Sequence, residues 1–542
     1  MRGAKSAKWV AIAAVVALGA TACGGGGTEE ANANKEVDPN GIVSYANGEP
    51  QNPLQPANTM EAYGSVTIEA IFSGLVDYND KGEITMTNAE SVTPDKDNKV
   101  WTVKLKKGWK FHNGEEVTAK SFVDAWNWAA NVENKQVNSS WFSDIEGYAD
   151  VHPEKGKPKK DKMSGLKVVD DQTFTITLAD GIPYFHYKLA YPVFSPLPSG
   201  FFKDPEGYGE KPVGNGPYKL KSWEHKKSIQ LVRNDDYKGP DKAKNGGIDL
   251  KAYTSDTAAY NDLVSNNVDS MPIVPNSELA NYKEDLGDRA IEQDYSAINT
   301  INPAFYTKQW KDIDVKVLQG LSMAIDRDTI NKTVFFGTRE SATSWVAKGV
   351  LGYEADTCGE FCKYNPKKAK ALIKEGGGVP GNKISIQYNA DQPHKDWVVA
   401  VCNSIKQATG VECEGDAKTD FQADLKVRDA KQVKSMYRSG WVLDYPFNGN
   451  FLRDLFGTGV AGNKADFSDK KFDDLVKKAD AAATVEESAK LYTQAEKQLA
   501  NTFPGIPLWY NRTISGHSEN VKNMKFGQDG DPIFTEVEVY KK

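Results

Sequence analysis

Strand patterns and helix patterns are interleaved along this chain, and this mixture restricts its possible folds more than any other feature. Residues 100–105 (VWTVKL), 173–178 (TFTITL) and 383–390 (KISIQYNA) alternate apolar with polar side chains, as half-buried strands do. Residues 118–131 instead place apolar side chains on one helical face, and Thr118 is a suitable N-cap. The pattern predicts an α/β or α+β protein.

Two more segments carry helix start and stop signals. In NPKKAKALIKEGGG, Pro366 falls in the first turn and Gly376 follows the last. In TVEESAKLYTQAEKQLAN, Thr484 and Glu487 form a capping-box pattern. With 542 residues the chain is too long for one hydrophobic core, so several domains are expected.

The N-terminus has the composition of an export signal. Arg2, Lys5 and Lys8 precede an apolar run of about 12 residues, which is too short for an ordinary membrane span. The following TAC resembles a bacterial lipoprotein signal, with Ala20 where Leu is usual. The resemblance implies cleavage before Cys23, lipidation of its thiol and export. The alternative is a plain secretory signal with an incidental cysteine. The polar, Gly-rich stretch that follows suits a flexible tether.

Four cysteines remain if Cys23 is lipidated, and an even number fits disulfides in an oxidising compartment. Three pairings are possible, of which the local pairs Cys358–Cys362 and Cys402–Cys413 are the simplest. The alternative is a zinc site of four thiols. Neither pair has the CxxC spacing that is usual in such sites.

Charge and motifs argue against several function classes. The net charge is −7 and no long basic run occurs, so nucleic acid is not an expected partner. The six histidines are far apart, and no HExxH, GxSxG, Walker or strand-associated GxGxxG motif is present. We therefore expect an exported binding protein rather than an enzyme, without a cofactor or a metal.

Five segments in a fixed order resemble the peptide/oligopeptide-type extracytoplasmic solute-binding proteins of ABC importers (bacterial solute-binding protein family 5). They include the turn GNGPYKL followed by LVRNDDY, and the helix motif DVKVLQGLSMAIDR, in which Lys316 replaces Arg and Gly320 replaces Ala. Together they cover nearly all of the mature chain. The segments are residues 91–126, 212–239, 312–330, 364–377 and 438–446.

The resemblance implies an α/β, two-lobed periplasmic-binding-protein fold, class II-like, with a hinge of two segments and an additional third subdomain. Ligand would be enclosed as the lobes close. The implied divisions are a signal peptide (1–22), a tether (23–41), lobe I (42–72, 194–295 and 516–542), the extra subdomain (73–193) and lobe II (296–515).

The resemblance also assigns roles within RSGWVLDYP. Asp444 would hold the α-ammonium of a bound peptide, and Arg438 would face its carboxylate end. Gly440 and its neighbours, Val442 included, would pair with the peptide main chain, and Trp441 would line a side-chain pocket. Without the family, the residues alone favour an ordinary turn residue before Tyr-Pro at Asp444 and an ordinary core residue at Trp441.

Other candidate contacts lie outside this stretch. His394 would be a second contact at the carboxylate end, or else an ordinary histidine in solvent at a helix N-terminus. Arg428 would be a further cation near that end. Glu61 and Ala62 fall where the family lays a short extended segment along the ligand. Trp141 would wall the pocket or belong to the core.

The function implied is that of a lipid-anchored, monomeric substrate-binding subunit. It would capture short peptides at the outer face of the cytoplasmic membrane and deliver them to an ABC permease with cytoplasmic ATPases. The same fold could instead bind a nickel chelate, haem, an opine or an oligosaccharide. A sugar would not need the charges of Asp444 and Arg438. An enzyme would need a nucleophile–base pair, and a purely structural surface lipoprotein would need no charged cleft.

Overall fold

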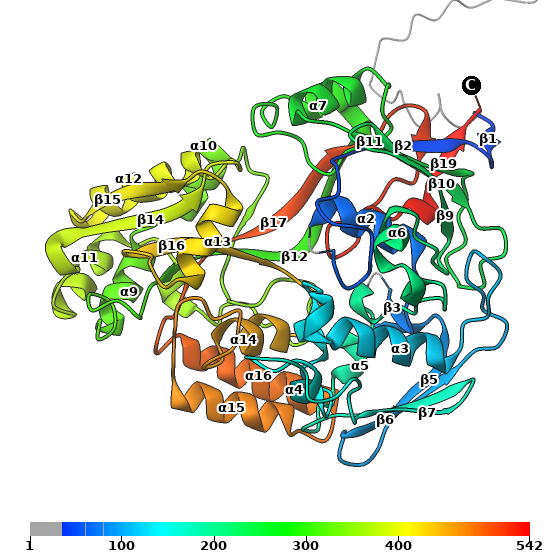
Figure 1. Cartoon of the computed structure of the whole chain (residues 1–542). Helices are drawn as coiled ribbons and strands as arrows, with labels where there is room; N and C mark the ends of the chain where they lie inside the picture. Colours follow the sequence, from blue (N-terminus) through cyan, green and yellow to red (C-terminus); the bar gives the residue numbers. More distant parts are fainter. Residues whose placement is uncertain (1–34, 60, 80, 542) are drawn as a thin grey trace, which may run out of the picture. The chain divides into compact units, whose positions relative to one another are not determined.

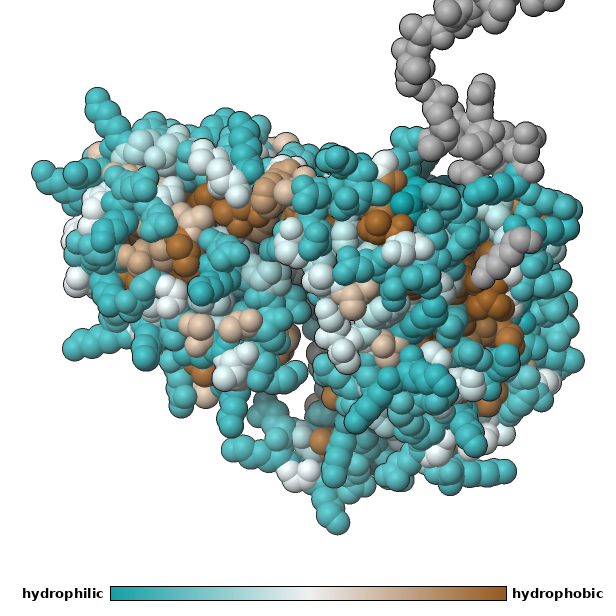
Figure 2. All heavy atoms as spheres, turned by 90° about the horizontal axis from the view of Figure 1, so that it is seen from above, coloured by the Kyte–Doolittle hydropathy of each residue, from teal (hydrophilic) through white to brown (hydrophobic). Residues whose placement is uncertain are grey.

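The computed structural model describes residues 35–59, 61–79 and 81–541. The signal peptide, Cys23 and most of the tether lie outside these residues, so the predictions about them stay predictions. The described residues from 37 to 541 belong to one compact unit (Figure 1). Within the described residues, no helix is both long and apolar enough to span a membrane. The face in Figure 2 is mostly hydrophilic, with separate small hydrophobic patches.

Both ends of the compact unit contribute to neighbouring sheets. A four-stranded sheet has the order β2-β11-β10-β9, in which β2 and β11 are parallel. A small sheet, β1-β19-β18, pairs the start of the unit with the end of the chain. The strands are β1 (Val37–Asp38), β2 (Ile42–Asn47), β9 (Tyr218–Glu224), β10 (Ser228–Arg233), β11 (Gly247–Ala252), β18 (Val521–Lys522) and β19 (Glu538–Tyr540). Helices of this region are α2 (Ala62–Ile71), α6 (Pro205–Glu210), α7 (Asp256–Val264) and α8 (Tyr282–Leu286).

A separate antiparallel sheet, β5-β6-β8-β7, is built from residues between 89 and 177. Phe122 and Trp126 of α3 pack on Phe174 of this sheet, with ring centroids 5.9 and 5.6 Å away. The two strands predicted here by alternation are confirmed as β6 and β8. The elements are β3 (Val76–Tyr78), β4 (Ile84–Met86), β5 (Ala89–Pro94), β6 (Val100–Leu105), β7 (Leu166–Asp170), β8 (Thr173–Thr177), α3 (Ala119–Ala130), α4 (Tyr148–Val151) and α5 (Phe185–Lys188).

The largest sheet has six strands in the order β13-β17-β12-β16-β14-β15. Its strands are β12 (Ala290–Pro303), β13 (Glu340–Ser341), β14 (Lys383–Asn389), β15 (Glu412–Lys418), β16 (Met436–Val442) and β17 (Ile506–Gly516). The helices of this part are α9 (Val315–Met323), α10 (Arg327–Val334), α11 (Pro366–Glu375), α12 (Lys395–Thr409), α13 (Phe421–Asp429), α14 (Gly449–Phe456), α15 (Lys470–Asp480) and α16 (Val485–Leu499).

The predicted helix ends are confirmed with one change of detail. Thr118 caps α3, and α11 starts at Pro366 and ends before Gly376. At α16 the Thr484 side chain accepts the Glu487 backbone N–H, as expected. The Glu487 carboxylate, however, accepts the backbone N–H of Ala483 instead of that of Thr484. One of the two capping-box hydrogen bonds therefore moves by one residue. The two side chains still accept one backbone N–H each, from Glu487 and from Ala483.

The long antiparallel strands β12 and β17 pair in two separate stretches. Residues 290–294 of β12 pair with 512–516 of β17, and residues 298–301 pair with 506–510. Between the two stretches, residues 295–297 lie opposite Asn511 alone. Such a bulge interrupts the ladder and allows the strands to bend locally.

The cysteine pairing is local. Cys358 is bonded to Cys362, and Cys402 in α12 is bonded to Cys413 in β15. The alternative of a four-thiol zinc site is wrong, because all four sulfurs are used in these bonds.

Candidate functional site

Strand β16 has one open edge in the middle of the largest sheet. On one side it pairs with β12 along its whole length, from Met436 to Val442. On the other side it pairs with β14 only at Met436 and Tyr437. Within the described residues, positions 438–442 therefore have no strand partner on that side. An extended ligand can add to such an edge through main-chain hydrogen bonds. Gly440 and Val442 are exposed there.

Asp444 lies two residues after the end of β16, in a bend of the chain. The sequence predicted a turn there because Tyr445 and Pro446 follow. Its side chain is half-buried and accepts a hydrogen bond from Asn450 Nδ2 at 2.8 Å. Burial raises the pKa of the Asp444 carboxyl to about 7, and the nearby Asp454 carboxylate adds to this, while the Asn450 hydrogen bond and Lys188 oppose it. No cation within the described residues forms an ion pair with Asp444. A ligand ammonium would supply that missing charge.

Asn450 organises the same corner, although the sequence did not single it out. It is fully buried at the start of α14, and its Oδ1 accepts both the Asp444 backbone N–H at 2.9 Å and the Trp441 indole N–H at 3.0 Å. Trp441 is half-buried, so it is neither a core residue nor a free surface one. One amide thus fixes the carboxylate and the aromatic ring together. The only signal in the sequence was an Asn close behind the turn DYPFNG.

Trp141 lies against the same corner from the part of the chain that contains α3. Its ring stacks on Tyr191 with centroids 4.0 Å apart, and it meets Tyr445 edge-on at 6.2 Å. Burial and the carboxylates of Asp444 and Glu69 raise the pKa of the Tyr191 hydroxyl, so this tyrosine lies near both acids. Trp141 is half-buried and therefore serves as packing and as a wall.

A further group of carboxylates borders this wall. Side-chain oxygens of Glu69, Asp529 and Asp531 lie within 4.8 Å of one another. Burial and mutual repulsion raise the pKa of Glu69 and Asp531. Glu69 and Tyr191 also line a shallow hollow. Raised pKa values favour protons shared within this group, so its charge is smaller than three separate carboxylates would give.

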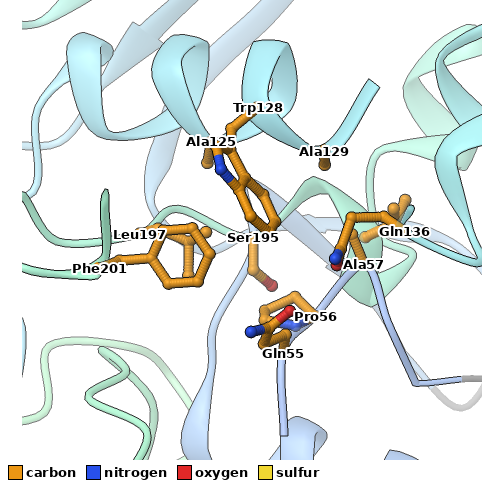
Figure 3. Close-up of a pocket in the computed structure, with 11 residues that line it drawn as sticks. Gln55, Pro56, Ala57, Ala125, Trp128, Ala129, Gln136, Ser195, Leu197 and Phe201 are labelled. Atoms are coloured by element: carbon orange, nitrogen blue, oxygen red, sulfur yellow. The ribbon is translucent and has the colours of Figure 1, made fainter. Parts of the chain in front are cut away.

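A second small hollow lies away from β16. Trp128, Phe201 and Leu197 surround it together with the polar side chains of Ser195 and Gln136 (Figure 3). The Oε1 atom of Gln136 is buried and has no hydrogen-bond partner within the described residues. The hollow suits an internal water molecule better than a peptide.

Arg438 marks the other end of the open edge. Its guanidinium donates to Asn389 Oδ1, from Nε at 2.9 Å and also from Nη2. Asn389 is fully buried, so the side chain is held firmly. A Cβ atom at position 440 would lie 4.0 Å from Arg438 Nη1, which shows that the guanidinium folds back along the strand. No acid within the described residues pairs with Arg438.

Two expected cations do not supply charge at this end. His394 accepts a hydrogen bond from the Trp397 indole at 3.0 Å. Burial, together with Arg438 and Arg339, lowers the pKa of His394 to about 3, so its ring is neutral. Arg428 is buried and ion-paired with the fully buried Asp424. Arg428 is therefore already neutralised within the fold, its role near the carboxylate end stays a prediction, and His394 can contribute only as a neutral group near Arg438.

The N-terminal segment at residues 61 and 62 begins helix α2, and its expected contacts with a ligand stay predictions. Glu61 is the N-cap of α2 and accepts backbone N–H groups from Gly64 at 2.9 Å and Gln51 at 3.1 Å. Its carboxylate is therefore used within the fold. Ala62 is the first residue of α2 and not part of an extended segment.

Arg339 is a cation that the sequence did not reveal. It follows α10, lies over the Phe335 ring at 4.1 Å and donates to Asn511 Oδ1 at 3.0 Å. Like Arg438 it has no acidic partner within the described residues, and burial lowers its pKa to about 10. The charges of Arg438 and Arg339 both contribute to the lowered pKa of His394. No local motif distinguishes Arg339, because its lack of an acid depends on the tertiary fold.

A family comparison fits this geometry. The description "Bacterial extracellular solute-binding proteins, family 5 Middle" matches residues 83–463. The chain belongs to this family. Members of this family bind solutes, so the expectation of a binding protein rather than an enzyme is confirmed. The family is extracytoplasmic.

Individual relatives of this solute-binding protein cover most of its length. It is 25% identical to "Oligopeptide-binding protein OppA" of Bacillus subtilis, over 97% of this chain and 98% of the relative. It is 28% identical to "Periplasmic oligopeptide-binding protein OppA" of Salmonella typhimurium, over 81% of each chain.

Solved structures support the expected fold. Haemophilus influenzae OppA in complex with RPPGFSPFR gives a TM-score of 0.76 at 22% identity, covering 93% of this chain and all of that one. The Escherichia coli murein tripeptide binding protein MppA gives 0.77 at 22% identity, covering 94% and 99%. The predicted α/β periplasmic-binding-protein fold is confirmed. The residue boundaries expected for its lobes stay predictions.

Proposed function

We propose that this chain captures short peptides with free termini between two closing lobes, as the substrate-binding subunit of an ABC importer. The observation that carries the proposal is the open edge of β16, with the Asp444 carboxyl at one end and the Arg438 guanidinium at the other, neither of which has an ion-pair partner among the described residues. A peptide has the matching features, an ammonium, a carboxylate and a hydrogen-bonding main chain. Family membership supports delivery to a permease, and the leader supports a lipid anchor at Cys23.

The bound peptide would run with its ammonium at Asp444 and its carboxylate towards Arg438. Gly440 would let the main chain of the ligand approach, and Trp441 with Trp141 would border side-chain pockets. Because the Arg438 guanidinium reaches back to position 440, the usable strand spans about four residues. At 3.3 Å per residue this is about 13 Å, which suits a ligand of about four residues. The names of the oligopeptide-binding relatives are consistent with this class.

Calorimetry with a peptide length series tests the proposal. We expect the tightest binding near four residues, and weaker binding when the N-terminus is acetylated. Mass spectrometry of ligand that co-purifies with the native protein is the second test. A co-purified chelate, haem or sugar, together with no measurable peptide affinity, would replace the peptide by the alternative ligand class.

A further inference from the structure

The buried amide of Asn450 holds two carboxylates at once. Its Oδ1 accepts the Trp441 indole N–H and the Asp444 backbone N–H. Its Nδ2 donates to Asp444 Oδ2 at 2.8 Å and to Asp454 Oδ2 at 3.2 Å. A side-chain amide has two acceptor sites and two N–H donors, so every hydrogen-bonding group of this amide is used. Asp444 and Asp454 are therefore joined through one nitrogen atom.

Three donors converge on the Asp454 carboxylate. Besides Asn450, the Tyr445 hydroxyl donates to Asp454 Oδ2 at 2.8 Å, and Arg453 Nε donates to its Oδ1 at 3.2 Å. Donors at both oxygens require an acceptor at both positions, which a neutral amide in the same place does not supply. The Asp454 carboxylate thus takes the second N–H of Asn450 and leaves the first directed at Asp444.

Arg453 connects Asp454 to a part of the chain that is distant in sequence. Its Nη2 donates to Asp144 Oδ1 at 3.4 Å, and its Nη1 donates to the Tyr184 hydroxyl at 3.1 Å. Tyr184 is fully buried and donates in turn to Asp480 Oδ1 at 2.6 Å. Figure 1 shows α4, which begins shortly after Asp144, beside α14 and α16.

Two cations fix the charge of Asp144. Lys188 pairs with Asp144 Oδ2 and Arg453 with its Oδ1, and all three side chains are largely buried. Burial alone would raise the pKa of the Asp144 carboxyl, but the two cations lower it to about 2, so it stays ionised. Asp144 and Lys188 belong to residues 73–193, the predicted extra subdomain. A continuous series of hydrogen bonds therefore leads from this part of the chain to the corner that holds Asp444.

We propose that Asp454 is a positioning residue of the ammonium site, and that the extra subdomain supports peptide recognition by holding Asp454 through Arg453. The inference rests on the proposed function, because it takes Asp444 as the group that binds the ligand ammonium. Asp454 acts on the ligand through Asn450. With its second N–H taken, the amide presents the first to Asp444 and keeps that carboxyl aligned with the open edge of β16.

The ammonium preference is the first measurement. It is the ratio of the Kd for an N-acetyl tetrapeptide to the Kd for the free peptide at pH 8, where a carboxyl with a pKa of about 7 is mostly ionised. In Asp454→Asn we expect it to fall about 5- to 20-fold, as for the loss of a charge-assisted hydrogen bond, with binding of the acetyl peptide within about 2-fold of wild type. Asp454→Glu keeps the charge and should recover part of the preference. Asp474→Asn, the same change at an exposed position of α15, should leave it unchanged.

A double-mutant cycle shows whether Asp454 acts through Asn450. Asn450→Ala alone removes the amide, so adding Asp454→Asn to it should change the preference by less than about 2-fold. Effects that multiply in the double variant would mean that the Asp454 charge acts on the ammonium directly, and this would refute the positioning role.

Proton release is a readout that a loss of packing alone would not move. Burial is the main reason for the raised pKa of Asp444, and the charge of Asp454 adds to it. Lys188, Tyr78 and Tyr191 are the other titratable groups that interact with Asp444. From a pKa of about 7, the wild type should release about 0.9 proton when it binds the free peptide at pH 6. In Asp454→Asn the release should fall by at least about a third, because the repulsion between the two carboxylates is gone.

Tyr184→Phe tests the connection to the extra subdomain. It removes the hydroxyl that accepts from Arg453 and should lower the ammonium preference about 2- to 4-fold. Tyr260→Phe is the matched control, because it removes a buried hydroxyl that donates to Asp285 in another part of the chain. The control should leave the preference unchanged.

The outcomes separate this inference from the proposed function. A wild-type preference in Asp454→Asn would refute the positioning role, and a wild-type preference in Tyr184→Phe would refute the connection to the extra subdomain. Should Asp454→Asn not fold, Tyr184→Phe decides both. Peptide binding itself would stand in these cases. No ammonium preference in the wild type would refute the role of Asp444 and this inference with it, and no binding to any peptide would refute the proposed function.

Discussion

Replacing Asp444 by Asn should abolish both the ammonium preference and the pH dependence of peptide binding. Raising the pKa of the carboxyl from 3.8 to about 7 corresponds to about 4 kcal/mol for ionisation in the empty site, at 1.36 kcal/mol per pH unit. A ligand ammonium requires the ionised form, so binding below pH 7 must release this proton. The affinity of the wild type should therefore fall about 50-fold from pH 7 to pH 5, because the carboxyl is half ionised at pH 7 and the loss approaches a factor of ten per pH unit below pH 6.

The assay is calorimetry in two buffers of different ionisation enthalpy, which counts the released protons. We expect nearly one proton released at pH 5 for the free peptide, and none for the N-acetyl peptide. Asp444→Asn should bind the free peptide at least about 30-fold more weakly at pH 7, because losing one partner of a buried charge pair costs about 2–5 kcal/mol. Asp312→Asn changes an exposed carboxylate of the same part of the chain and is the matched control.

The empty protein gives an independent check with a defined sign. Because the folded pKa of Asp444 lies above its unfolded value of 3.8, the folded state holds the proton between about pH 4 and pH 7. Stability should decline as the pH rises through this window, and Asp444→Asn should remove that part of the decline. An unchanged pH slope of affinity in Asp444→Asn, or equal losses for free and acetylated peptides, would refute the reasoning.

Three other changes test the surroundings of the site. Asn450→Ala should weaken binding at least about tenfold and lower stability by about 1–3 kcal/mol, because two N–H groups lose their acceptor; calorimetry and urea unfolding measure both effects. Arg453→Met should lower the free energy of unfolding in urea by about 3–5 kcal/mol, since Asp454 and Asp480 lose the cation they share while Asp144 keeps Lys188; a loss below 1 kcal/mol would show that these pairs are solvated. Replacing Cys402 and Cys413 by Ser should lower stability by about 2–4 kcal/mol; an unchanged melting temperature would contradict this.

The sequence predicted most of what depends on local pattern. Alternation located β6, β8 and β14, and Thr118 fixed the start of α3 because capping depends on neighbouring residues alone. The family resemblance drew attention to Asp444 because a carboxylate after a strand is visible in the chain. These features require no knowledge of distant contacts.

The charges at the Arg438 end of the open edge of β16 could not be predicted in the same way. Asp424 and Arg428 stand four residues apart on one helix, so their pairing was open to prediction. The neutrality of His394 depends on Trp397 and on arginines from three other segments. That Arg339 has no ion-pair partner among the described residues depends on which side chains the elements around it bring close. Such properties follow from the tertiary fold.

The small sheet β1-β19-β18 has a practical consequence for following this protein on cells. Val37 pairs with Tyr540, so the chain leaves its last strand about 5 Å from β1, a strand that lies within the last residues of the predicted tether. A fluorescent reporter fused to the C-terminus would therefore start beside the attachment point of the tether. A reporter of ligand capture belongs on an exposed position far along the chain from both ends, such as Asp312.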